Sequence, residues 1–358
     1  MNERFQFDFS ERTEAARLAA LLMRDIEERG LQPGDRYLNG PEVAEKYGVT
    51  VITANRALQS LAERAVVERR QRAGTFISKQ YSPGGESSEL QRVHLLMPAT
   101  YFRAARTTIE QAIAGIHAEL PDCHIQLTFV PVSGEVAFAR KLVQQAKSNG
   151  ATEGAVLYVS SGELQQFFRE SGFPAVAFGS VFPEAEQLPW VDRDQRQIGE
   201  LLSQFLLQEG HRNLAVLMRE RWGFGDNLLL DGLQGVLAAA NAGATFRVRN
   251  LPTVPEAGLA MLRLLLQGEE APTALICRSE RLALLAAQVA AEFKLKMPRQ
   301  LRIVVAEAVP QFPCVEPTVS QEEQGAFVGR MLKQMASGKR PDPDHLRVPV
   351  RFRNLLSS

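Results

Sequence analysis

Residues 33–77 read PGDRYLNGPEVAEKYGVTVITANRALQSLAERAVVERRQRAGTFI, and this stretch decides the fold of the first part of the chain. Asn39 can cap a helix, and Glu42 stands at the capping-box position three residues later. Gly48 is a typical helix stop, and Thr50 can cap a second helix directly after it. The spacing therefore predicts two helices joined by a tight turn.

The second of these helices has an apolar stripe and an opposite face of mixed chemistry. The stripe follows the i, i+3, i+4, i+7 spacing of a buried helix face and consists of Ala54, Ala57, Leu58 and Leu61. The opposite face presents Val51, Ile52, Asn55, Arg56 and Gln59. In a helix-turn-helix the second helix enters the major groove of DNA, so we expect this face to contact bases.

A short β-hairpin with a basic tip follows the second helix. Apolar pairs at 66–67 and 76–77 flank Arg69, Arg70 and Arg72, with Gly74 in the turn. Residues 50–79 hold six basic side chains against two acidic ones, a net +4 in a chain whose formal net charge is +0. The basic hairpin suits DNA phosphates or an adjacent groove. The modest charge fits a homodimer, because two heads double the phosphate contacts.

Several segments of this stretch stand in the order found in the winged-helix domain of GntR-type bacterial transcription regulators, namely 33–36, 43–44, 47–50, 56–58, Leu61 and 70–76. Residues 10–79 resemble that domain, which implies a double-stranded DNA operator as partner and a DNA-binding domain over residues 1–80. Family members commonly carry arginine where this chain has Pro41, Val51 and Asn55; Arg56 can supply the missing charge. The alternative is a winged helix that binds protein.

The expected DNA contacts lie on the second helix, just before the first helix and on the hairpin. They are Arg36, Thr50, Val51, Ile52, Thr53, Asn55, Arg56, Arg70, Arg72 and Gly74. Val51 and Ile52 form an apolar pair that suits thymine methyl groups, and Asn55 can pair with adenine through N6 and N7. This predicts a half-site with an A·T-rich core and Arg56 at its flank. Alternatively, Val51 or Ile52 packs inward.

The remaining chain predicts a linker followed by a larger α/β domain. Residues 81–90 are rich in Pro, Gly and Ser and have no apolar period. From residue 91 to 358, short apolar runs alternate with helical segments, which predicts parallel sheets covered by helices and divided into two lobes. The expected strands are 93–97, 125–130, 155–159, 175–178, 214–218, 246–250, 275–277 and 303–305. The expected helices are 108–120, 136–149, 163–171, 197–209, 228–242, 256–267 and 281–293.

This second domain is similar to the periplasmic-binding-protein-like sensor domain of LacI-type regulators. The landmarks are the segments 191–194, Gly199, 209–212, 231–232, 272–275 and 317–321, in this order. The resemblance implies two lobes that close on a small-molecule effector, with the chain crossing between lobes near Asp192, near Ala308 and after Gly338. A GntR-type head on a LacI-type sensor resembles the arabinose-responsive repressors.

The polar groups with which such domains hold sugar hydroxyls are changed here. Their positions carry Gly179, Leu229, Ser279-Glu280 and Glu307. Because an unmade polar contact costs roughly 1–3 kcal/mol, the effector is expected not to be a simple neutral sugar, or the site no longer binds one. Strand ends are where α/β sheets bind ligands, and the candidates there are Tyr101, Phe102, Arg219, Trp222, Arg278, Glu280 and Glu307.

Other classes of function are disfavoured. No apolar run approaches the ~18 residues of a membrane span, the start MNERFQFDFSER has no signal-peptide core, and three dispersed cysteines favour a reducing cytoplasm. No metal-binding motif, cofactor fingerprint or catalytic motif is complete; the third glycine of a GxGxxG in 223–228 is Leu228. The sequence thus predicts a cytoplasmic, homodimeric repressor, not an enzyme and without metal or cofactor. The alternative is a solute-binding or sensor protein without ligand-controlled DNA binding.

Overall fold

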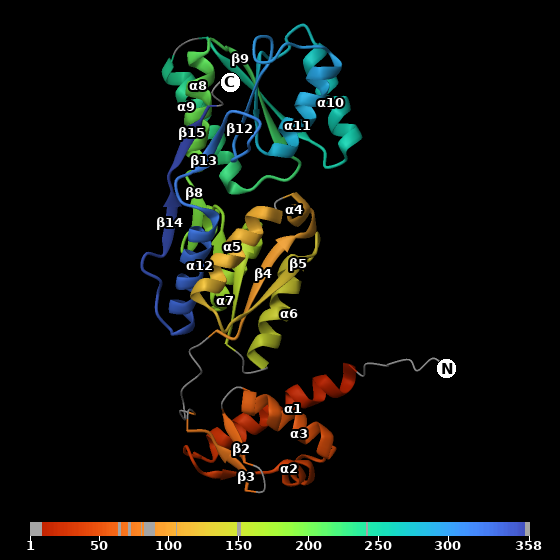
Figure 1. Cartoon of the computed structure of the whole chain (residues 1–358), viewed down its shortest axis with the longest axis vertical. Coiled ribbons are helices and arrows are strands. Elements are labelled where there is room, and N and C mark those ends of the chain that lie inside the picture. Colours follow the sequence, from red (N-terminus) through yellow and green to blue (C-terminus); the bar gives the residue numbers. More distant parts are fainter. Residues whose placement is uncertain are drawn as a thin grey trace, which may run out of the picture. The chain divides into compact units, whose positions relative to one another are not determined.

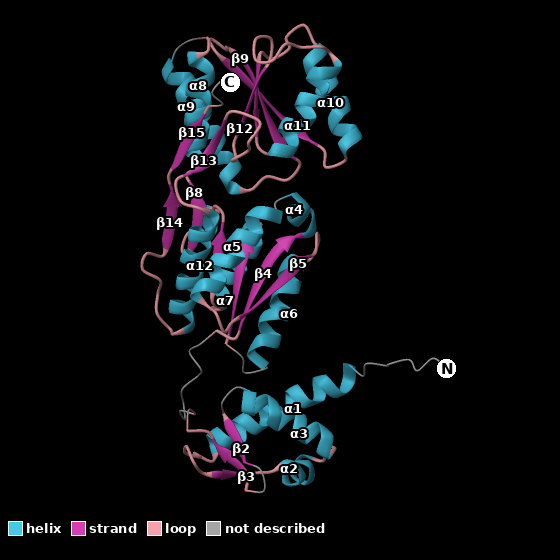
Figure 2. Ribbon diagram, in the orientation of Figure 1, coloured by secondary structure: helices cyan, strands magenta, loops and turns pink. Residues whose placement is uncertain are grey.

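The structure is a computed structural model that describes residues 9–63, 66–70, 73–79, 81, 90–104, 106–148, 152–240 and 243–354 (Figures 1 and 2). The chain divides into two compact units. The first comprises residues 1–92, 137–153 and 336–338, and the second comprises 93–136, 154–335 and 339–358. The first unit contains the N-terminal head, and the second contains two lobes that we call lobe 1 and lobe 2.

The head consists of three helices and a small sheet with strand order β1-β3-β2. Its elements are α1 (Phe9–Glu28), β1 (Arg36–Tyr37), α2 (Gly40–Tyr47), α3 (Val51–Glu63), β2 (Val67–Arg70) and β3 (Gly74–Ile77). The predicted capping box at Asn39 and Glu42 is present, and Gly48 ends α2 in the left-handed conformation. Strands β2 and β3 pair antiparallel as the expected hairpin.

The apolar stripe of α3 forms the centre of the head core, as predicted. Ala54, Ala57, Leu58 and Leu61 are fully buried and pack with Leu22 of α1. Asp25 of α1 adds polar contacts to this core, because its carboxylate accepts hydrogen bonds from Tyr37 at 3.0 Å and from Lys46 at 2.6 Å. One carboxylate thus joins α1, β1 and α2, and α3 is held on a rigid support.

Lobe 1 is a six-stranded sheet with the order β14-β8-β7-β6-β4-β5. Its strands are β4 (Arg92–Pro98), β5 (His124–Val130), β6 (Glu153–Tyr158), β7 (Ala175–Phe178), β8 (Trp190–Arg193) and β14 (His345–Val348). The helices of this part of the chain are α4 (Ala99–Ala104), α5 (Arg106–Glu119), α6 (Glu135–Ser148), α7 (Gly162–Ser171) and α12 (Gln321–Ala336), with the short 3-10 turn η1 (Pro183–Ala185).

Lobe 2 is a second six-stranded sheet, with the order β10-β9-β11-β12-β13-β15. Its strands are β9 (Asn213–Arg219), β10 (Thr245–Leu251), β11 (Ala274–Cys277), β12 (Arg302–Val305), β13 (Cys314–Pro317) and β15 (Val350–Arg353). Its helices are α8 (Gln195–Gln208), α9 (Phe224–Ala240), α10 (Pro255–Gln267) and α11 (Glu280–Glu292). Strand β15 runs antiparallel to β13, whereas β9 to β13 run parallel.

Both faces of the lobe 2 sheet are buried at β9 and β11, which explains why these two strands are continuous apolar runs. Alternate residues of β9 point to opposite faces. Leu217 belongs to the core beneath α10 and α11, and Val216 belongs to the core beneath α8 and α9. Figure 1 shows these helix pairs on the two sides of the sheet. The arrangement is the predicted α/β class with parallel sheets in two lobes.

All eight expected strands and all seven expected helices of this region are present, with ends that differ by a few residues. Strands β8, β13, β14 and β15 and helices α4 and α12 were not expected from the sequence. The four strands are short, and each carries a charged residue or histidine. The crossing expected near Ala308 was wrong. The chain stays in lobe 2 through β13 and enters lobe 1 at α12, because Cys314–Pro317 pairs with β15 rather than ending at the hinge.

Each lobe contains one pair of helices that approach so closely that glycine is required. A Cβ on Gly115 of α5 would lie 1.9 Å from the carbonyl oxygen of Glu322 in α12. In lobe 2 a Cβ on Gly199 of α8 would lie 2.0 Å from the carbonyl oxygen of Leu229 in α9. The obstructing atoms are backbone atoms, so neither helix pair can accommodate a larger residue without moving apart.

Two glycines of α9 therefore predict opposite outcomes. A Cβ on Gly232 would lie 2.1 Å from the carbonyl oxygen of Arg196, whereas nothing lies within 4 Å of a Cβ on Gly235. Gly232→Ala is expected to destabilise the protein by about 3 kcal/mol, the upper end of usual overpacking costs. Gly235→Ala should be neutral or stabilising by up to about 1 kcal/mol through helix propensity. Unfolding in urea measures both, and equal effects would contradict the close packing.

Candidate functional site

The exposed face of α3 carries four of the ten residues predicted to contact DNA, namely Val51, Ile52, Asn55 and Arg56. The side chains of Val51 and Ile52 are 46% and 61% exposed, so neither packs inward against the head. Thr50 caps the helix, because its hydroxyl accepts a hydrogen bond from the Thr53 amide at 3.1 Å. Thr53 was predicted on the DNA-contacting face, but it is 2% exposed and hydrogen-bonds Thr50. Its side chain belongs to the helix cap because the helix turns that position inward.

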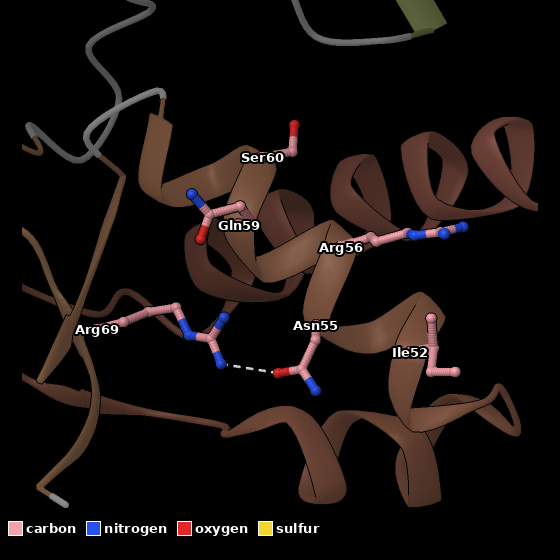
Figure 3. A pocket seen from close by; sticks show the side chains of 6 residues that line it. All are labelled: Ile52, Asn55, Arg56, Gln59, Ser60 and Arg69. Carbon is pink, nitrogen blue, oxygen red and sulfur yellow. Dashed lines mark hydrogen bonds between the residues drawn. The ribbon is translucent and has the colours of Figure 1, made fainter. Parts of the chain in front are cut away.

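An open depression lies on this face of the head. It has a volume of about 460 Å³ and is lined by Ile52, Asn55, Arg56, Gln59, Ser60 and Arg69 (Figure 3). Arg69 comes from strand β2, and its Nη2 donates a hydrogen bond of 2.7 Å to Oδ1 of Asn55. The depression thus combines an apolar side chain with several hydrogen-bond donors, which is the chemistry of a surface that reads base edges.

The predicted contacts on the hairpin occupy different environments. Arg70 pairs with Glu68 at 3.2 Å and lies 4.8 Å above the ring of Phe76. Gly74 has φ +110°, which requires glycine at the turn, and the side chain of Arg36 lies beside it. Arg72 lies outside the described residues, so its contribution stays a prediction from the sequence.

A network of buried polar side chains lies where lobe 1 meets lobe 2. Arg278, 6% exposed at the end of β11, donates from Nε to Asp226 of α9 at 2.5 Å and from Nη2 to Gln195 of α8 at 3.1 Å. Gln195 donates in turn to Asp192 of β8 at 3.0 Å, and Asp192 accepts a hydrogen bond from Ser180. The network joins three elements of lobe 2 to two segments of lobe 1.

Further contacts cross between the lobes beside this network. Arg193 donates to the carbonyl oxygen of Ala306 at 3.2 Å. The rings of Phe182 in lobe 1 and Phe224 in lobe 2 have centroids 5.5 Å apart. The guanidinium of Arg219 lies 5.7 Å from the centre of the Tyr101 ring. The lobes therefore meet through a hydrogen bond, an aromatic pair and a cation–π contact.

Four of the seven predicted ligand-binding residues, with Glu280 beside them, come together at this junction. Arg219 lies over Tyr101 and pairs with Glu307 at 3.6 Å. Glu307 also accepts a hydrogen bond of 2.7 Å from the backbone amide of Glu280 at the start of α11. Arg278 completes the group through its contacts with Asp226 and Gln195.

The other two predicted ligand-binding residues have other neighbours. Phe102 packs edge-on against Phe129 of β5, with ring centroids 5.7 Å apart. Trp222 is 38% exposed, and its indole N–H donates to Asn250 of β10 at 2.9 Å. Phe102 and Trp222 thus each contact a residue of a neighbouring strand, whereas the local sequence alone predicts that they line the ligand site at the strand ends. Among the altered sugar-binding positions, Leu229 is fully buried in the core beneath α8 and α9.

Two buried donors at or near the junction lack a partner among the described residues. They are Nη1 of Arg278 and the hydroxyl of Tyr158, which is 5% exposed at the end of β6. Tyr158 lies 6.2 Å from the Tyr101 ring, which joins it to the same group. Val159 follows it with φ +48°, a strained conformation for a β-branched residue. Unpaired buried donors and backbone strain cluster at functional sites.

The pKa shifts of the charged side chains at the junction follow from burial and from the charges beside them. Burial alone would raise the pKa of Asp226, but the charge and hydrogen bond of Arg278 outweigh burial and lower this pKa below its usual value. Burial alone would lower the pKa of Arg278, but the charge and hydrogen bond of Asp226 outweigh burial and raise this pKa above its usual value. Both pKa shifts favour the charged form, so Asp226 and Arg278 form one ionised pair. Arg193 lies near Arg278, and burial together with that like charge lowers the pKa of Arg193.

The sequence placed Arg69 in the basic hairpin but not among the expected DNA contacts, and it did not indicate Ser180, Gln195, Asp226 or Tyr158. Asp226 could have been noticed as an acid in the first turn of a helix that follows a glycine-rich loop. The others carry no local signal, because only the fold brings them to their partners. Within the described residues, no group of three or more His, Cys, Asp or Glu is placed to hold a metal. In the same part of the chain, no helix is both long and apolar enough to span a membrane.

Comparison with known proteins assigns both parts of the chain. Residues 14–77 match the family described as bacterial regulatory proteins, gntR family, and residues 203–354 match the periplasmic binding protein-like domain. The chain joins a GntR-type helix-turn-helix domain to a periplasmic-binding-protein-like domain. It is a transcription regulator with a DNA-binding domain and an effector domain, and these families are not enzyme families.

Individual relatives of the regulator are distant. It is 20% identical over 283 residues to the arabinose metabolism transcriptional repressor of Halalkalibacterium halodurans, covering 74% of this chain and 72% of that protein. Among solved structures it is similar to a LacI-family regulatory protein from Chloroflexus aggregans, with a TM-score of 0.62, 20% identity, and coverage of 73% of this chain and 96% of the other. It is also similar to a CelR–cellobiose complex, with a TM-score of 0.62, 19% identity, and coverage of 88% and 98%. These structures support the fold.

The buried ion pair of the regulator predicts a stability difference between two aspartates of α9. Asp226→Asn leaves the charge of Arg278 buried without its counter-ion, which is expected to destabilise the protein by about 3–5 kcal/mol. Asp231→Asn removes a surface pair with Arg196, at 3.1 Å and half exposed, and should cost less than about 1 kcal/mol. Urea unfolding at neutral pH compares them; similar losses would contradict the role of the buried pair.

The same pair predicts how stability depends on pH. Because the pKa of Asp226 is lower in the folded state than in the unfolded state, its contribution is fully present above the unfolded value of about 3.9 and is lost as pH falls through the folded value. The stability difference between wild type and Asp226→Asn should therefore shrink below about pH 4.

Proposed function

We propose that this chain is a cytoplasmic, homodimeric repressor that binds a double-stranded DNA operator and changes its operator affinity when a small molecule binds between the two lobes. The observation that carries the proposal is the face of α3, where an exposed apolar pair adjoins a depression lined with hydrogen-bond donors. Such a face is costly in water unless it meets a complementary surface. The major groove offers both thymine methyl groups and base-edge acceptors.

The head supplies the two kinds of contact that a DNA-binding domain needs. Base contacts are proposed for Val51, Ile52, Asn55 and Arg56, and contacts to the backbone for Arg36, Thr50, Arg70, Arg72 and Gly74. The A·T-rich core predicted from the sequence is retained for Val51 and Ile52, because both side chains are exposed. A homodimer is proposed because one head has a modest charge and two heads double its phosphate contacts.

The junction supports an effector that brings hydrogen-bond acceptors. Three of its carboxylates are already engaged: Asp226 by Arg278, Asp192 by Ser180 and Gln195, and Glu307 by Arg219. Two buried donors of this group have no partner in the part of the chain that the structure describes, Nη1 of Arg278 and the Tyr158 hydroxyl. An effector with carboxylate or phosphate oxygens fits this imbalance better than a simple neutral sugar, whose hydroxyls need acceptors as well as donors.

The names of the relatives point to sugars, and the chemistry of this junction departs from them. The similar repressor is named for arabinose metabolism, and one similar structure is a complex with cellobiose. Here Gly179 supplies no side chain, and Leu229 is turned into the lobe 2 core. We therefore propose a different effector class. Control of DNA binding requires that the effector bind the closed and open lobes with different affinity.

One observation favours a second candidate, a DNA-binding protein whose lobes no longer respond to a ligand. The lobes already meet without any ligand through Phe182–Phe224 and Arg219–Tyr101. Arg278 is held by Asp226 and Gln195. These contacts could stabilise one fixed lobe arrangement, in which case no small molecule would alter DNA binding.

DNA binding by the full chain should be strongly salt-dependent. Arg72→Ala is expected to weaken binding to every sequence and to reduce the slope of log K against log salt by about 1 per lost contact. Arg299→Ala removes the same charge at an exposed site of lobe 2 and should leave the slope unchanged. Mobility shifts with sites selected from random DNA measure both. Folded protein that shifts no DNA at low salt would refute the proposed function.

The effector class is tested by thermal shift with a panel of organic acids, phosphate esters and neutral sugars. A ligand at about 100 times its Kd should add roughly 2.7 kcal/mol of stability. Tyr158→Phe should reduce the affinity for an acidic ligand about five-fold, the value of one hydrogen bond, without destabilising the free protein. Tyr47→Phe in α2 is the control. Tight binding of a neutral monosaccharide would contradict the assignment, and no response to the panel would favour the second candidate.

A further inference from the structure

The side chain of Asn55 is fixed from two sides. Arg69 donates from Nη2 to Oδ1 of Asn55 at 2.7 Å (Figure 3). On the other side lies the backbone of Gly40, the first residue of α2, where an added Cβ would come within 2.6 Å of the same Oδ1. The amide therefore has a defined orientation, with its oxygen toward Arg69 and its NH2 group remaining as donor.

Arg69 and Arg70 are neighbours on β2 but have different surroundings. Arg70 pairs with Glu68 and lies over Phe76. Arg69 instead reaches α3 and lines the depression with Ile52 and Asn55. Alternation of side chains along a strand accounts for the difference, because successive residues point to opposite faces. Of the two adjacent arginines, one is thus directed to the face of α3 that would enter the groove.

The hydrogen bond between Arg69 and Asn55 changes what Asn55 can recognise. An asparagine that reads adenine uses its amide NH2 toward N7 and its oxygen toward N6. Here the oxygen is already an acceptor for a guanidinium. The pair as a whole presents the NH2 of Asn55 and the remaining N–H groups of Arg69. These groups donate hydrogen bonds, and guanine is the base whose major-groove edge offers two adjacent acceptors, O6 and N7.

We propose that Arg69 and Asn55 together form a single base-reading unit for guanine, with Arg69 as the specificity-determining residue. This inference rests on the proposed function, since it concerns how the head reads its operator. Ile52 lies one helical turn before Asn55 in the same depression and is 61% exposed. The half-site therefore contains a guanine read by the pair beside a thymine contacted by Ile52, instead of a core made only of A·T pairs.

The experiment is selection of sites from random DNA by the full chain, followed by affinities for every single-base change in the selected site. Wild type is expected to select guanine at one position next to thymine. Arg69→Ala should reduce the preference for that guanine by roughly 5- to 150-fold, the range for a bidentate base contact, and leave other positions unchanged. Asn55→Ala should relax the same position, and the double variant should lose little more than either single variant.

Arg70→Ala is the matched control, because it removes the same charge from the adjacent residue. It should lower affinity for all sequences alike and keep the guanine preference. Gly40→Ala keeps every donor but displaces the Asn55 side chain, so it should weaken the guanine preference without changing net charge.

Three results would overturn the inference. One is that Arg69→Ala behaves like Arg70→Ala, which would make Arg69 a phosphate contact. Another is that wild type selects adenine at the position that Asn55→Ala relaxes, which would make Asn55 an independent adenine reader. In both cases the chain still binds DNA and the proposed function stands. Absence of DNA binding by folded wild type would refute that function and this inference with it.

Discussion

The buried charge of Arg278 is the constraint on which the arrangement of the two lobes depends. A guanidinium removed from water needs a carboxylate and further acceptors close by. Asp226 supplies the carboxylate from α9, and Gln195 supplies an amide oxygen from α8. Gln195 also donates to Asp192 of lobe 1. Because the buried charge of Arg278 needs both partners, it fixes the first turns of α8 and α9. Gln195 then connects this part of lobe 2 to lobe 1.

The same junction shows how a binding site can be built around an imbalance of hydrogen-bonding groups. The carboxylates of Asp226, Asp192 and Glu307 are engaged by protein partners, while buried donors on Arg278 and Tyr158 lack a partner among the described residues. Buried polar groups of this kind are unfavourable by themselves. A ligand that supplies oxygen acceptors would relieve the cost, which links the energetics of the fold to the chemistry of the effector.

The proposed binding face of the head consists of exposed side chains, whereas the polar groups of the junction are buried. Its core is held by the α3 stripe and by the hydrogen bonds of Asp25 with Tyr37 and Lys46. This support leaves Ile52 and the Asn55–Arg69 pair on the outer face of α3, where they face water. A duplex that supplies acceptors and a methyl group in register would replace that water without reorganising the head.

The sequence by itself determined the features that depend on local spacing. Capping residues and the period of apolar side chains established α2 and α3 of the head, the hairpin, and the alternating strands and helices of the lobes, because hydrogen bonds between near neighbours and burial of one face are local requirements. Tertiary structure decided the rest. It placed Trp222 against Asn250, buried Thr53 against the capping residue Thr50, and kept β13 in lobe 2. It also joined Arg69 to Asn55 and Arg278 to Asp226, which stand 14 and 52 residues apart. No periodic pattern encodes such pairs, because each exists only when separate elements pack together.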